Sequence, residues 1–122
     1  MKDEDLLLKW EATYKKGLLS FWILLLLHER SSYPFEMGSL IAEISQKTIS
    51  VDDNSIYRAL NRFQEVGIVD SETRPSNQGP DRKYYHLTEK GCWLLKQFIE
   101  RNIRVFEMPE VASRIAAVNL VQ

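Results

Sequence analysis

The stretch from Ser50 to Gly91 restricts the fold more than any other part of this 122-residue chain. It starts with an amphipathic segment, about residues 51–65, whose apolar residues recur at spacings of three and four, so we expect a helix with one buried face. A short apolar stretch, a turn cluster over 75–81 and a β-rich stretch over 83–87 follow. Thr88 then begins another helix. This order of elements predicts a winged helix-turn-helix.

The N-terminal part of the chain predicts two helices. Residues 3–16 have acidic residues in the first turn and Lys15 and Lys16 in the last, which suits the helix dipole. The run Leu18–Leu27 is apolar on nearly all sides. Ten residues are too few to span a bilayer, so we expect a central helix surrounded by protein. Because this apolar run does not have the pattern of a signal peptide, we expect a cytoplasmic protein.

The middle of the chain should hold a helix over about 34–46, after a break at Ser31–Pro34. Its buried side should include Phe35, Ile41 and Ile44, together with Met37 or Gly38. In the following helix, Ser50-x-x-Asp53 resembles a capping box. The inward residues of that helix share an apolar character and are Ile56, Ala59, Leu60 and Phe63.

The C-terminal part predicts one long helix from Thr88 to about 107, with a wide apolar stripe. Met108-Pro109 should end it, because the residue before proline avoids the helical conformation. A last short helix follows, with Val111, Ile115 and Val118 in register.

Composition limits the function classes. The net charge is −1, so a DNA-binding surface has to be a local patch rather than a global field. Cys92 is the one cysteine, and His28 and His86 are far apart, which excludes a disulfide framework and a cysteine-based zinc site. We therefore expect no metal and no cofactor.

The exposed side of the helix at 51–65 is rich in asparagine and arginine, which hydrogen-bond base edges in the major groove. The turn between the strands is flanked by basic residues, which suit phosphate or minor-groove contacts. A solvated polar helix face and a charged hairpin that stays soluble are the plainer interpretations. The residues predicted to bind DNA are Ser32, Tyr33, Asn54, Ser55, Tyr57, Arg58, Asn61, Arg62, Arg74, Arg82 and Lys83.

The chain resembles the PadR family of transcription regulators over about residues 17–91. The most specific matches are residues 79–85 (Gly-Pro-Asp-Arg-Lys-Tyr-Tyr) and 87–91 (Leu-Thr-Glu-Lys-Gly), at the end of the wing and the start of the next helix. Residues 55–60 (Ser-Ile-Tyr-Arg-Ala-Leu) stand where the family has a Leu-Tyr-Pro-Ala-Leu-like segment in its recognition helix. Arg58 replaces the usual proline, and the N-terminal helix lies outside the shared core.

The resemblance implies an α-rich α+β fold, a winged helix-turn-helix with a two-stranded wing, plus N-terminal and C-terminal helices for dimerisation. We expect an N-terminal helix at 1–16, a DNA-binding domain at 17–90 and dimerisation helices at 91–122. The resemblance further implies a homodimer built through the C-terminal helix, which represses a nearby promoter. The dimerisation residues would be Leu94, Leu95, Phe98, Ile99, Ile103 and Phe106.

Some relatives respond to flat aromatic ligands held between paired helices, so the resemblance also implies a small aromatic effector. Trp22, Trp93 and Phe98 would line its site, whereas the plainer interpretation is that these aromatic side chains only pack. As a whole, the sequence favours a sequence-specific DNA-binding regulator that recognises an inverted-repeat operator. The alternative is a winged-helix module that binds protein without DNA. A small enzyme is disfavoured, because no recognisable catalytic motif is present.

Overall fold

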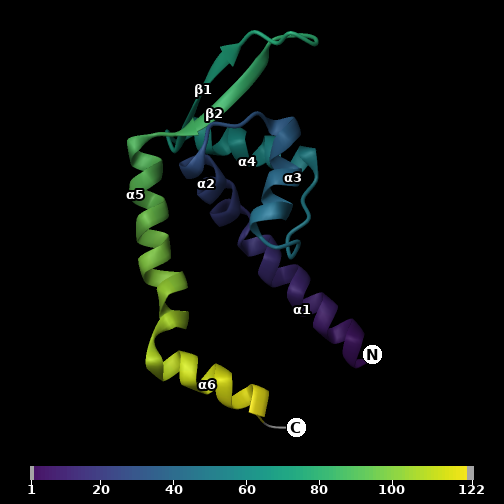
Figure 1. The fold of residues 1–122 in the computed structure, drawn as a ribbon, viewed down its shortest axis with the longest axis vertical. Helices are drawn as coiled ribbons and strands as arrows, with labels where there is room; N and C mark the ends of the chain where they lie inside the picture. Colours follow the sequence, from purple (N-terminus) through teal and green to yellow (C-terminus); the bar gives the residue numbers. More distant parts are fainter. Residues whose placement is uncertain (1, 121–122) are drawn as a thin grey trace.

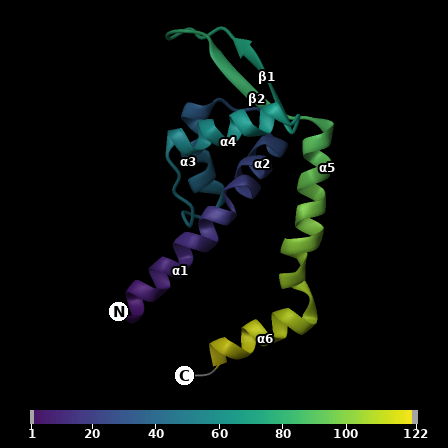
Figure 2. The same cartoon turned by 180° about the vertical axis from the view of Figure 1, so that it is seen from behind.

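The computed structural model describes residues 2–120, and within them it has an α-rich α+β architecture. Helices α2, α3 and α4 form a helical body, the hairpin β1–β2 projects from one end of it, and α1 and the α5–α6 arm extend from it in different directions (Figures 1 and 2). The elements are α1 (Asp3–Gly17), α2 (Leu19–Glu29), α3 (Pro34–Ile44), α4 (Asp53–Glu65), β1 (Val69–Arg74), β2 (Arg82–Leu87), α5 (Glu89–Phe98), η1 (Ile99–Ile103), η2 (Arg104–Glu107) and α6 (Pro109–Leu120).

Helix α2 lies at the centre of the fold and packs against α3, α5 and β2. Ile23, Leu24, Leu26 and Leu27 are all buried, which confirms the prediction of a helix surrounded by protein. Each such side chain contributes about 1.5–3 kcal/mol to stability when it leaves water. The inward face predicted for α4 is also confirmed, since its four apolar residues are at most 8% exposed.

Helix α3 begins at Pro34 as predicted but differs from its prediction at the C-terminal end and in one buried residue. It ends at Ile44, two residues early, and Gln46 and Lys47 have positive φ values of 55° and 64°. Phe35 was expected on the buried side but is 78% exposed, whereas Met37 is completely buried. Phe35 lies in the first turn of α3, where Pro34 and Met37, three residues apart, are the buried residues.

The beginning of α4 is capped by Asp52, so the predicted Ser50–Asp53 capping box is wrong. An Oδ atom of Asp52 accepts the Ser55 backbone N–H at 2.7 Å. This hydrogen bond, a second one with the Ser55 side chain and the nearby Arg58 guanidinium lower the pKa of the Asp52 carboxyl. Helix α4 therefore begins at Asp53, directly after this cap.

The wing is an antiparallel hairpin in which Val69 pairs with Leu87 and Arg74 with Arg82. Neighbouring residues on a strand face opposite sides, so only one of Tyr84 and Tyr85 can enter the core. Tyr85 does so at 2% exposure, and Tyr84 faces the other side of the hairpin. This confirms the expected division of the two tyrosines.

The helix after the wing starts as predicted but does not continue to residue 107 as one α-helix. The Thr88 hydroxyl accepts the Gly91 N–H at 3.1 Å and caps α5. A Cβ on Gly91 would overlap the carbonyl oxygen of Ile68, so glycine lets α5 pack closely against the start of the wing. The α-helix then widens into a π-helical turn, η1, and tightens into a 3₁₀ turn, η2, before Pro109 begins α6. Within residues 2–120 no helix is long and apolar enough to cross a membrane.

Candidate nucleic-acid interface

The outer face of α4 exposes the polar side chains that the sequence predicts. Asn54, Arg58, Asn61 and Arg62 are exposed, and Tyr57 is 47% exposed beside them. Ser55 is half-buried, and its hydroxyl accepts a long, 3.4 Å hydrogen bond from the Arg58 guanidinium. Because the opposite face of α4 is anchored in the core, the helix can present these groups to a groove as a rigid unit.

The wing carries two arginines directly opposite each other, and each lies over a tyrosine ring. The Arg82 guanidinium is 4.4 Å from the Tyr33 ring centre, and the Arg74 guanidinium is 4.3 Å from that of Tyr84. The two rings meet edge to face with centres 5.2 Å apart. These cation–π contacts hold both guanidinium groups on one face of the wing.

The remaining charges of the wing are less uniform. Arg74 also forms an ion pair with Glu72 at 2.6 Å, which offsets part of its charge. Lys83 alternates with Arg82 along β2 and faces the other side of the hairpin, with its ammonium 5.4 Å from the Tyr85 ring centre. Among the described residues, Arg82 and Lys83 take part in no ion pair.

Ser32 was predicted to bind DNA, and the structure places it in the interior instead. It is fully buried, and its backbone forms an isolated β-bridge with Tyr85. A buried side chain has no surface to offer a duplex, so we leave Ser32 out of the interface.

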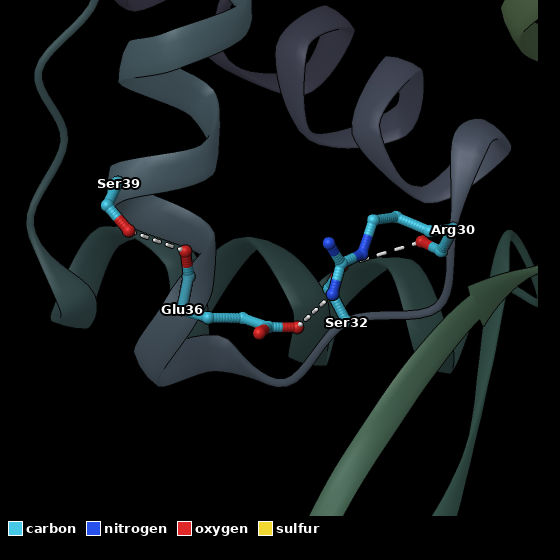
Figure 3. Close-up of polar contacts among 4 residues, drawn as sticks. All are labelled: Arg30, Ser32, Glu36 and Ser39. Carbon is cyan, nitrogen blue, oxygen red and sulfur yellow. Dashed lines mark hydrogen bonds and ion pairs between the residues drawn. The ribbon is translucent and has the colours of Figure 1, made fainter.

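The turn around Ser32 is held by polar contacts, shown in Figure 3. The Ser32 hydroxyl donates a long hydrogen bond to the Arg30 carbonyl at 3.5 Å, and Arg30 forms an ion pair with Glu36 at 3.4 Å. The Ser39 hydroxyl donates to the Glu36 carbonyl at 3.1 Å. These contacts join the end of α2 to the first turns of α3 and set the position of Tyr33 between them. Tyr33 itself is half-buried against the wing.

Comparison with known proteins identifies the family. The model of the transcriptional regulator PadR-like family matches residues 23–97, which is more than half of the chain. This chain belongs to the PadR-like family. The family consists of transcriptional regulators, which agrees with the prediction that the chain is not an enzyme.

Solved structures of PadR-like regulators share the fold. A PadR-like transcription factor from Bacteroides fragilis is 29% identical, with a TM-score of 0.65 over 88% of this chain and 98% of its own. A PadR-family regulator from Eggerthella lenta is 20% identical, with a TM-score of 0.72 over 98% of this chain and 96% of its own. Bacillus subtilis PadR, solved in complex with operator DNA, is 23% identical with a TM-score of 0.61. That match covers 67% of this chain and 47% of the B. subtilis chain. The winged helix-turn-helix prediction is therefore confirmed.

The residues predicted to hold an effector in this PadR-like regulator do not all line one hollow. Trp93 is 59% exposed and lines a hollow of about 370 Å³ with Phe21 and Phe98. Trp22 instead lines a second hollow of about 500 Å³ with Leu7, Trp10 and Tyr14 of α1. The two are linked through Phe21, whose ring centre is 5.2 Å from Trp22 and 5.8 Å from Phe98.

The predicted dimerisation residues have different environments in the single chain. Leu95 is 4% exposed and belongs to the chain's own core. Leu94, Phe98, Ile99 and Ile103 are half-buried, and Phe106 is 50% exposed. Leu95 therefore has little surface left for a partner, whereas half of the surface of Phe106 remains exposed.

The sequence placed the N-terminal helix among the dimerisation helices but named no apolar residues of α1 for that role. This helix has no buried residue, although it carries many large apolar side chains. The repeated spacing of Leu7, Trp10 and Tyr14 was the available signal, because it marks a face that has to be covered by something. The exposed large apolar residues of α1 are Leu6, Leu7, Leu8, Trp10 and Tyr14.

Proposed function

We propose that this PadR-like regulator binds double-stranded DNA sequence-specifically as a homodimer and represses transcription from an inverted-repeat operator. The observation that carries the proposal is the exposed polar face of α4, which lies next to a wing with two stacked arginines. The B. subtilis relative, which has been solved with operator DNA, supports the same activity. Because the target would be chromosomal DNA, we expect a cytoplasmic protein.

Helix α4 would enter the major groove. Arginine donates two hydrogen bonds to guanine, and asparagine exchanges two with adenine, so Arg58, Arg62, Asn54 and Asn61 are the proposed readers of bases. The Tyr57 hydroxyl and Ser55 would contribute contacts at the sides of the helix. The Asp52 carboxylate at the start of α4 would repel phosphate and so weaken contacts with the DNA backbone on that side.

The wing would contact the adjacent backbone or minor groove. Arg74 and Arg82 share one face, with their guanidinium groups supported by Tyr84 and Tyr33. Planar arginines of this kind suit a narrow minor groove, where the negative potential is strongest. Lys83 on the other face would serve as a phosphate contact, which adds affinity without sequence information.

The dimer would be built by the C-terminal part of the chain. Large apolar side chains remain exposed on α5, η2 and α6, including Trp93, Phe106 and Ile115. A two-fold axis through this surface would place two α4 helices about one DNA turn apart, roughly 34 Å, and would favour an inverted repeat. The exposed apolar side chains of α1 are the other surface that a second subunit could cover.

We also propose a small aromatic effector beside Trp93. Its indole lines an apolar hollow with Phe21 and Phe98, and ligand sites are typically apolar hollows of this size. Trp22 is left out of this proposed site, because it faces a different hollow.

The decisive experiment is a titration of duplex DNA from the promoter of the regulator's own gene at two salt concentrations. We expect binding that weakens steeply as salt rises, because each neutralised phosphate releases counterions. Absence of binding at low salt, or binding independent of salt, would overturn the proposal. The alternative, a winged-helix module that binds protein, is kept because the net charge is −1.

A further inference from the structure

A hollow of about 560 Å³ lies where three elements meet: the end of α1, the turn before α4, and the first turns of α4. Figure 2 shows α1 continuing from α2 and leaving the helical body, and residues of its last turn line the hollow together with the first turns of α4. The charged residues that line the hollow are Lys15, Lys16, Asp52 and Arg58. Three cations therefore line this hollow: Lys15 and Lys16 from α1, and Arg58 from α4. Arg58 also belongs to the exposed face of α4 that is proposed to contact bases.

The charges around this hollow are only partly neutralised. Lys15 forms an ion pair with Glu11 at 3.5 Å, and its side chain remains 38% exposed. The Asp52 carboxylate is occupied as the cap of α4. Within residues 2–120, Lys16 and Arg58 form no ion pair. Asp52 offsets part of the charge of Arg58, and three cations against this one carboxylate leave the charged lining of the hollow net positive.

We propose that Lys15 and Lys16 bind backbone phosphates of the DNA strand that borders the groove entered by α4. The proposal rests on the proposed function and extends its interface to α1, whose lysines lie outside the family-matched residues 23–97. A lysine is a compact charge on a flexible stem, which suits phosphate better than a base edge. Contacts of this kind fix the position of α4 in the groove and contribute no base preference.

A purely structural role for the lysines predicts a different result. Cations in the last turn stabilise a helix by their interaction with its dipole, and this effect would act on folding alone. Such a role leaves the salt dependence of DNA binding unchanged. The salt dependence is therefore the readout that separates the two roles.

The test compares Lys15→Gln, Lys16→Gln and the double variant with the wild type on a mixed-sequence duplex of about 30 base pairs, roughly three helical turns. Lys96→Gln, an exposed lysine of α5 remote from the hollow, is the matched control. Each lost phosphate contact should reduce the salt slope by about 0.9. Between about 50 and about 200 mM salt, the affinity ratio of wild type to Lys16→Gln should then fall about threefold.

The outcomes separate this inference from the proposed function. Slopes for the α1 variants equal to that of Lys96→Gln, with a wild type that binds DNA, would overturn the lysine contacts alone. A wild type that binds no DNA at low salt would overturn the proposed function and this extension together. Circular dichroism melting of each variant reports folding, and a variant that melts early is replaced by Lys→Arg, which keeps the charge and should restore the slope.

Discussion

Ser32 and Tyr85 exchange two backbone hydrogen bonds, with Ser32 N–H donating at 3.1 Å and Tyr85 N–H donating at 2.8 Å. The pair joins the turn before α3 to the return strand of the wing, across more than 50 residues of sequence. Tyr33, the next residue, then stacks edge to face on Tyr84. The wing is thus held at a set position relative to the helical body by backbone and ring contacts together.

The Tyr33 ring should be needed for DNA binding through its support of the wing. Tyr33→Ala removes the partner of Tyr84 and the ring beneath Arg82, so we expect weaker DNA binding and a loss of about 0.5–1.5 kcal/mol in stability. Tyr33→Phe keeps the ring and is the matched control, with both properties near wild type. Fluorescence anisotropy with labelled duplex and chemical denaturation measure the two. Equal DNA affinity for Tyr33→Ala and wild type would show that the stack does not position the wing.

Two variants of the Asp52 cap should distinguish its effect on folding from its effect on DNA binding. Asp52→Ala should lower the free energy of unfolding, because it removes the acceptor of the Ser55 N–H. Asp52→Asn keeps an acceptor and should fold nearly as well, yet bind DNA more tightly, since the carboxylate beside Arg58 is gone. Unchanged DNA binding by Asp52→Asn would place Asp52 outside the field of the phosphates.

The same carboxylate gives a pH dependence of stability. Its pKa is held below the ordinary value of 3.8 by hydrogen bonds from Ser55 and by the charge of Arg58. A lowered folded-state pKa means that the stabilisation is fully present above pH 3.8 and is lost as pH falls through the lowered value. The stability difference between wild type and Asp52→Ala should therefore shrink in that acidic range.

Arg58 and Lys83 should affect DNA binding in different ways. Arg58→Ala should cost about 1–3 kcal/mol of binding free energy and relax the preference at one base position. Lys83→Ala should weaken binding to all sequences about equally and reduce the salt slope by about one. Selection of bound duplexes from a random pool, followed by titration at several salt concentrations, measures both. An unchanged base preference for Arg58→Ala would assign Arg58 to the backbone instead.

Substitutions at Phe106 and at Leu95 should have different effects, the first on dimerisation and the second on folding. Phe106→Asp places a charge on an exposed apolar surface and should give a folded monomer. Leu95→Ala leaves a cavity in the chain's own core and should cost about 2–5 kcal/mol of stability at any oligomeric state. Analytical ultracentrifugation and thermal melting distinguish the two effects. A Phe106→Asp protein that remains dimeric would move the interface away from η2. Truncation after Gly91 should likewise leave a monomer or an aggregate.

Trp93 should report on the proposed effector. Planar hydrophobic ligands should quench tryptophan fluorescence. Trp93→Ala should abolish the quenching, because it removes the indole that lines the hollow. Trp22→Phe is the control, since Trp22 lines a separate hollow and its replacement should leave the response in place. Quenching that disappears with Trp22→Phe and survives in Trp93→Ala would place the ligand against α1 instead.

Local patterns in the sequence predicted the elements well where one face of a segment meets the core. The division of α4 into apolar and polar sides, the Thr88 cap and the alternation of Tyr84 and Tyr85 follow from periods of about 3.6 and 2 residues, and the structure has all three. The break at Pro109 also follows locally, because proline restricts the residue before it.

The predictions failed where a local pattern leaves more than one choice. The cap of α4 is Asp52 rather than Ser50, because Asp52 also offers a side-chain acceptor three residues before a backbone N–H, that of Ser55. The long C-terminal helix became α5, η1 and η2, and the pattern of its apolar residues alone does not reveal that widening.

By itself, the sequence determined the inward and outward faces of α4 and of the return strand β2, because side-chain periodicity is a property of the backbone. Only the tertiary structure decided that Ser32 is interior, that Trp22 and Trp93 line separate hollows, and that Arg58 shares a charged space with Lys15 and Lys16. Each of these depends on how elements far apart in the chain are brought together. That arrangement is set by the packing of the whole core around α2, which no single segment encodes.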